Sequence, residues 1–179
     1  MIVIRKIVLL LVIFTASTAN SLVINGNDVV DIYGHEGFVT AYDQSTITTH
    51  IGSSVAFLNG RDDSIFNING GDISWLQLYN NNKTSISFVE DLSWLLVSDD
   101  SEITIFGTNF SYSGGHLSGV WSNGLAFSFW ALEELDLHSG AIGNIIPDNI
   151  ILRAVSVPEP SSLTLLIMCL ALLTYRKKI

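Results

Sequence analysis

The segment Gly70-Gly71-Asp72-Ile73-Ser74-Trp75-Leu76 contains the pattern that decides the fold. A small residue precedes an aromatic–aliphatic pair, and this arrangement occurs four times, at intervals of 19, 18 and 19 residues. The four pairs are Phe38-Val39, Phe57-Leu58, Trp75-Leu76 and Trp94-Leu95. A regular repeat of this length indicates a solenoid or another stacked array.

Each unit continues in the same way after its aromatic residue. Five positions later comes an acidic or amide residue, at Asp43, Asp62, Asn80 and Asp99. A hydroxyl residue follows, which we place at Ser45, Ser64, Thr84 and Ser101. Then comes an alternating pair, which we place at Ile47/Thr49, Phe66/Ile68, Ile86/Phe88 and Ile103/Ile105. The alternation predicts strands with one buried face, and the Asp/Asn positions predict turns.

These patterns predict an all-β fold, a parallel β-solenoid of about four 19-residue coils with three short strands in each coil. Stacked coils would lie ~4.8 Å apart, so that equivalent residues form ladders. An antiparallel β-sandwich is the alternative, because turn signals every 8–12 residues also suit that architecture. Identical residues at equivalent positions favour the solenoid, since stacking in register places like residues against each other.

The pattern changes after Ile105. Ser122-Asn123-Gly124 predicts a hairpin turn of type I′, and we expect a C-terminal β-hairpin cap on the last coil. A last strand is expected at 150–155 and a partial first coil at 23–33, while the acidic cluster Glu133-Glu134-Asp136 is expected in a solvated loop.

The N-terminal residues have the layout of a secretory signal. Arg5 and Lys6 lie beside the apolar run 7–14, and Ser17 and Ala19 have the small-residue spacing of a cleavage site. We expect signal peptidase to cut after Ala19, and an uncleaved anchor is the alternative. The run is short for a spanning helix, which needs ~20 residues.

The C-terminal residues 157–179 combine three features. Pro158-Glu159-Pro160 holds the chain extended, an apolar segment predicts a transmembrane helix at 162–175, and Arg176, Lys177 and Lys178 follow. This order resembles the PEP-CTERM sorting signal of exported bacterial proteins. The resemblance implies recognition of Pro158, Glu159 and Pro160 by an exosortase-type processing enzyme. An ordinary C-terminal anchor is the alternative. In either case the basic cluster would remain on the cytoplasmic side.

The repeats are also similar to those in a group of exported PEP-CTERM proteins from environmental Gram-negative bacteria. The similarity covers most of residues 37–130, including Phe106-Gly107-Thr108-Asn109-Phe110-Ser111-Tyr112 and Leu117-Ser118-Gly119-Val120-Trp121-Ser122-Asn123-Gly124. The resemblance implies export, and it brings no molecular activity with it.

Charge and cysteine content narrow the function classes. Between residues 20 and 156 there are three basic and sixteen acidic residues, a net charge of −13, so nucleic acid is not an expected partner. The only cysteine is Cys169, within the apolar C-terminal segment, which excludes disulfides and cysteine-based zinc sites from the exported domain.

No catalytic motif is evident, and we expect neither an enzyme nor an obligatory cofactor. The turn pairs Asp62-Asp63 and Asp99-Asp100 are candidate Ca²⁺ ligands, although solvated turn acids are the simpler interpretation. Polysaccharide lyases on β-helices use a basic residue, and this domain offers only Arg61, Lys83 and Arg153.

The sequence therefore predicts a signal peptide (1–19), an exported repetitive β domain (20–156) and a sorting signal (157–179). We expect a surface or extracellular-matrix protein connected with exopolysaccharide, anchored transiently in the inner membrane. The alternative is a carbohydrate- or calcium-binding module, for which exposed aromatic rings would provide the platform.

Overall fold

The computed structural model describes residues 21–140 and 142–155. The predicted signal peptide with its cleavage site at Ala19 lies outside these residues, as do Pro158, Glu159, Pro160, the segment 162–175 predicted to be a transmembrane helix, and the cluster Arg176, Lys177 and Lys178. Within the described part of the chain, no helix has the length and apolar character needed to cross a bilayer.

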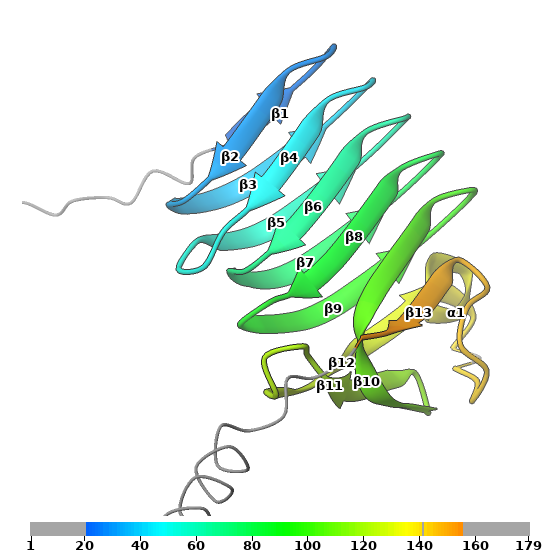
Figure 1. Ribbon diagram of the computed structural model, residues 1–179. Coiled ribbons are helices and arrows are strands. Elements are labelled where there is room, and N and C mark those ends of the chain that lie inside the picture. Colours follow the sequence, from blue (N-terminus) through cyan, green and yellow to red (C-terminus); the bar gives the residue numbers. More distant parts are fainter. Residues whose placement is uncertain (1–20, 141, 156–179) are drawn as a thin grey trace, which may run out of the picture.

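The repeats form a parallel β-solenoid of about four turns, as Figure 1 shows. Each turn contributes a longer strand to one sheet and a shorter strand to the other. The longer ones are β3 (His35–Ala41), β5 (Ser54–Gly60), β7 (Asp72–Leu78) and β9 (Asp91–Val97). Their partners are β4 (Thr46–Thr49), β6 (Ile65–Asn69), β8 (Lys83–Phe88) and the long β10 (Glu102–Ser113). A shorter first coil, β1 (Ser21–Ile24) and β2 (Val29–Ile32), precedes them.

We call the two faces of the coil stack the odd-strand sheet (β1, β3, β5, β7, β9) and the even-strand sheet (β2, β4, β6, β8, β10). All neighbouring strands within each of them pair in parallel. The sandwich alternative is therefore wrong for the coils, because it requires antiparallel neighbours.

The core consists of ladders of inward-facing side chains between the two sheets. From the odd-strand sheet, Val39, Leu58, Leu76 and Leu95 lie in register, and each is fully buried. From the even-strand sheet, the ladder contains Ile47, Phe66, Thr84 and Ile103. Stacking in register thus reproduces the spacing of the sequence repeat.

The third unit differs from the sequence alignment. Thr84 and Ile86 occupy the positions that we expected for Ile86 and Phe88, and Asn82 replaces Thr84 at the hydroxyl position beside Ser64. The inner residue follows the aromatic one by nine positions in every unit, whether or not it is apolar. Thr84 is accommodated inside because its hydroxyl donates to Asn82 Oδ1 at 2.6 Å.

The small residue before each aromatic marks a bend in the longer strand. The ladder passes over Gly37, Ala56, Ser74 and Ser93, while the residues on either side of them stay paired. Two consecutive residues, the small and the aromatic one, then lie on the side away from the core, and Figure 1 shows the longer strands curving. Each coil therefore has two strands, one of them bent, where the sequence predicted three.

The chain changes plan at its C-terminal end. After Gly114 and Gly115 it returns as β11 (His116–Val120), antiparallel to β10, and then as β12 (Ala126–Glu133), antiparallel to β11 and parallel to β9. The positive φ angles of Gly114 (55°) and Gly115 (81°) fit a type I′ turn. In the expected turn at Ser122–Gly124, only Gly124 has a positive φ, so that turn is not type I′.

The remaining segment returns to the even-strand sheet. Helix α1 (Glu134–Ser139) follows β12 directly, so Glu134 and Asp136 lie on a helix and not in the expected loop. The last strand, β13 (Ile150–Ala154), pairs in parallel with β10, close to the bounds expected from the sequence.

Candidate functional site

A ladder of aromatic rings runs along the outer face of the odd-strand sheet. Phe38, Phe57, Trp75, Trp94 and Trp130 lie in register on successive strands. Their ring centroids are 4.8, 6.1, 5.0 and 5.2 Å apart, with neighbouring planes within 18° of parallel. His116 lies against Trp130 at the end of the series, at 3.6 Å between centroids and with its plane tilted by 43°. We call these six rings the aromatic ladder.

Sequence reasoning found four of the six members of the aromatic ladder and missed His116 and Trp130. Trp130 follows Trp94 by 36 positions, because β11 lies between them in the chain. A signal was present, since Trp130-Ala131 is another aromatic–aliphatic pair and Ala131 is buried like the aliphatic members of the other pairs.

The stacking direction decides what the aromatic ladder can bind. Each ring covers the face of the next, so the rings present mainly their edges to solvent, and none of the tryptophans in the ladder is fully buried. A sugar ring needs an open aromatic face for its C–H groups. The most exposed of the Phe and Trp rings is Phe38, 45% accessible, whose partner on the preceding strand is only Ser21. Ring stacking contributes roughly 0.5–1.5 kcal/mol per pair, so the ladder stabilises the coil stack.

The acidic turns form a second ladder, in which each side chain serves the coil before it. Asp43, Asp62, Asn80 and Asp99 all have φ near 55°, in the left-handed region that Asp and Asn tolerate. Their side-chain oxygens accept the backbone N–H groups of Gly26, Asp43, Asp62 and Asn80, at 2.9, 3.3, 3.3 and 3.1 Å. These oxygens are therefore part of the scaffold, and a bound cation would compete with the N–H groups for them.

We predict that the left-handed turn positions require Asp or Asn. Asp62→Asn keeps both the acceptor and the tolerance of positive φ, as Asn80 does in the next coil, and should change the free energy of unfolding by under about 0.5 kcal/mol. Asp62→Ala loses both and should cost about 1–3 kcal/mol. Asp62→Gly should lie between them. Urea denaturation measures the series, and equal stability of the Ala and Asn variants would contradict this role.

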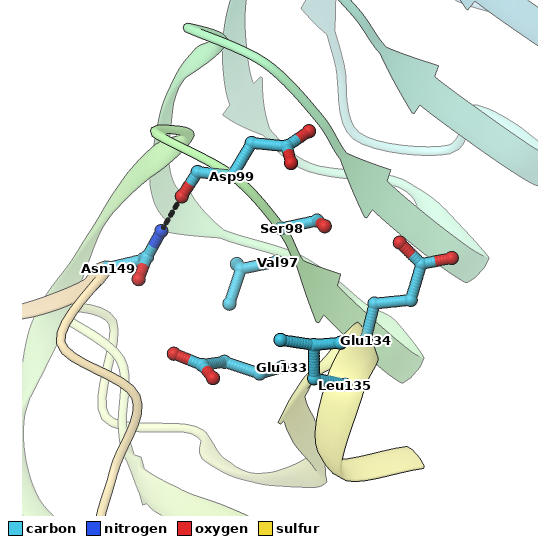
Figure 2. A pocket seen from close by; sticks show the side chains of 7 residues that line it. All are labelled: Val97, Ser98, Asp99, Glu133, Glu134, Leu135 and Asn149. Carbon is cyan, nitrogen blue, oxygen red and sulfur yellow. Dashed lines mark hydrogen bonds between the residues drawn. The ribbon is translucent and has the colours of Figure 1, made fainter. Parts of the chain in front are cut away.

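A pocket lies where the end of β9 meets the start of α1 and the segment before β13. It has a volume of about 320 Å³, and it is lined by Val97, Ser98, Asp99, Glu133, Glu134, Leu135 and Asn149. Figure 2 shows that the carboxylates of Asp99, Glu133 and Glu134 point in three different directions. They do not converge on a common point, as a pair of catalytic carboxylates or a metal site would require.

Asn149, which sequence reasoning did not single out, closes one side of this pocket. Its Nδ2 group donates to the carbonyl oxygens of Asp99 at 2.9 Å and Ser101 at 2.8 Å. Asn82 bonds to Ser64 O in the same way at 2.9 Å. Both amides therefore join one coil to the next, and no sequence period marks Asn149 because it follows the helix.

Burial and, to a smaller extent, nearby acids raise the pKa values of two tyrosines at this end of the molecule. Burial raises the pKa of Tyr79, and the Glu134 and Asp99 carboxylates raise it further, although Arg61, 4.8 Å from the centre of the ring, opposes them. Burial also raises the pKa of Tyr112, with additional contributions from Asp136 and Glu133. The negative field around the pocket attracts cations. Ser98 is not activated as a nucleophile there, because no histidine, lysine or cysteine lines the pocket.

Among the described residues, no group of three or more His, Cys, Asp or Glu side chains is placed to hold a metal ion. The site residues predicted in the terminal segments lie outside this part of the chain, so the structure brings none of them together.

Comparison with known proteins identifies no relative, since no family model, curated protein or solved structure matches the chain.

Proposed function

We propose that this chain is an exported structural protein of the cell surface or extracellular matrix, sorted and cleaved by an exosortase-type enzyme. The observation that carries the proposal is the three-part C-terminal segment, with Pro158-Glu159-Pro160, an apolar run and Arg176-Lys177-Lys178 in that order. The signal layout that ends at Ala19 supports the same route.

The described domain fits a structural role. Its turn acids and aromatic rings contact the coils next to them, so these groups serve the coil stack. The antiparallel strands β10 to β12 would act as the cap of the stack. The result is a stacked domain whose net charge of −13 would keep it soluble among exopolysaccharides.

The proposed route has three steps. Signal peptidase removes residues 1–19, and the helix at 162–175 holds the chain in the inner membrane with the basic cluster on the cytoplasmic side. The exosortase-type enzyme then recognises Pro158, Glu159 and Pro160, since two prolines favour the extended conformation that a protease groove accepts. Cleavage near this motif releases the domain toward the surface.

The test is to change the motif in the native host and to measure the mass of the exported protein. We expect the wild-type protein to lose residue 179, whereas Glu159→Gln combined with Pro160→Ala should leave it intact and in the membrane fraction. Glu134→Gln, on α1, is the matched control and should be processed normally. A wild-type protein that retains Ile179 after export would overturn the proposal.

A further inference from the structure

Two free edges of the β-structure lie at the same end of the molecule, and a third, that of β13, lies at the other end. The hydrogen-bonded path through the strands starts at β1 and ends at β2, and both belong to the first coil. At the other end, β12 and β11 join the odd-strand sheet to β10, and only β13 lies off this path, beside β10. Within the described residues, β1 and β2 each pair on one side only, so the first coil presents two unpaired strand edges.

The core is also partly open at this end, although Ile24 and Ile32 of the first coil are buried. Leu22 and Val30 continue the inner ladders of Val39 and Ile47, which are fully buried, yet both are only partly buried. In a solenoid the next coil would cover them. Nearby, Val29 is 71% exposed on the outer face of β2. The end of the stack thus exposes apolar surface between two strand edges.

The turn ladder ends here without a side chain. The position equivalent to Asp43 is Gly26, which also has a positive φ, of 69°, and whose N–H group binds Asp43. No carboxylate therefore projects from this turn position into the space where another coil would lie. One carboxylate does lie two residues further on. Asp28 is exposed, and it occupies the position where the second coil has the buried Ser45 and the third coil the buried Ser64.

We propose that the first coil is a docking surface for a second copy of this chain, joined head to head about a two-fold axis. The surface requires an occupant with two strands, one over each sheet, and apolar side chains between them, and the first coil itself has this form. A two-fold axis makes the new strand pairs antiparallel and closes the assembly at two copies. The inference rests on the proposed function in one respect, since it concerns the exported protein from which residues 1–19 have been removed.

Charge sets the strength of this contact. Asp28 brings a carboxylate into each copy's half of the contact, so association should be weak and favoured by high local concentration. Asp28→Ser restores the residue of the next two coils and should strengthen association about tenfold. Asp148→Ser makes the same change in charge at an exposed site near the other end and should have no effect.

Leu22→Lys puts a charge into the open core and should abolish the dimer. Leu135→Lys, at a 77% exposed site, is its control.

The experiment is sedimentation velocity of the exported protein over a wide concentration range, with circular dichroism to verify that each variant is folded. Distances between spin labels in a Cys169→Ser background give the orientation. With about five coils of ~4.8 Å in each copy, labels at Asn27→Cys should lie close together and labels at Ser122→Cys roughly 50 Å apart.

Two outcomes overturn the docking surface. One is a protein that remains monomeric at every concentration, with or without residues 1–19. The other is a dimer in which the two spin labels at residue 122 lie close together. Mass spectrometry of the same sample tests the proposed function separately, because residues 1–19 still attached after export contradict the route and leave the sedimentation result interpretable.

Discussion

Phe66→Ala should lower the free energy of unfolding by about 3–5 kcal/mol. The Phe66 ring is fully buried in the even-strand sheet, between Ile47 in the coil before and Thr84 in the coil after. Thr84 is the small neighbour of Phe66 in the inner ladder of the even-strand sheet, so the Phe66 ring fills core space that Thr84 does not reach. The ladders of hydrogen bonds hold the coils at a fixed spacing, so the cavity cannot close by collapse. Typical domains have only 5–15 kcal/mol of total stability, so the loss should be evident.

The matched control is Ile65→Thr, on the same strand but on the opposite face, where Ile65 is 41% exposed. It keeps a β-branched side chain and should change stability by no more than about 0.5 kcal/mol. Urea denaturation followed by far-ultraviolet circular dichroism compares the two variants. Equal effects would mean that Phe66 does not face the core, and the register of the even-strand sheet would then be wrong.

The repeat spacing was sufficient to predict the coils, because stacking in register copies sequence intervals directly into space. The predicted alignment of the third unit was wrong at Thr84. It placed apolar residues at the inner positions, whereas the fixed count of residues from Trp75 places Thr84 there. In a solenoid the count decides, since a shift by two residues would break the parallel ladder. A polar residue at an inner position is then accommodated by a local partner, here Asn82.

The C-terminal end was less predictable, because its contacts arise from the way the chain returns and not from a period. Trp130 reaches the aromatic ladder only after the excursion through β11, and Asn149 reaches the Asp99 turn only after α1. The turn acids show a different limit. Their positions followed from the repeat, but their bonds to the preceding coil depend on left-handed backbone angles that the sequence pattern alone does not give. The sorting-signal residues remain predictions.

Gly71→Ala should be nearly as damaging as the loss of Phe66, at about 2–4 kcal/mol. Gly71 has a φ of 102°, which L side chains rarely adopt, and an added Cβ would collide with Ser53 Oγ and lie 3.1 Å from Ser53 O. Its N–H group donates to the Glu90 carboxylate, which also accepts the N–H of Gly52 at 3.3 Å. A shift of Gly71 would therefore disturb three consecutive coils at this corner.

Gly52→Ala separates the backbone effect from the collision. Gly52 has a φ of 81° but nothing within 4 Å of an added Cβ, so its substitution should cost only about 1–2 kcal/mol. Ser53 Oγ is buried and has no hydrogen-bond partner among the described residues, so Ser53→Ala alone should cost little. Combined with Gly71→Ala it removes the colliding atom and should recover roughly 1 kcal/mol or more, a coupling that a double-mutant cycle measures. Strict additivity of the two changes would show that Gly71 is held by its backbone angle alone and not by close contact between coils.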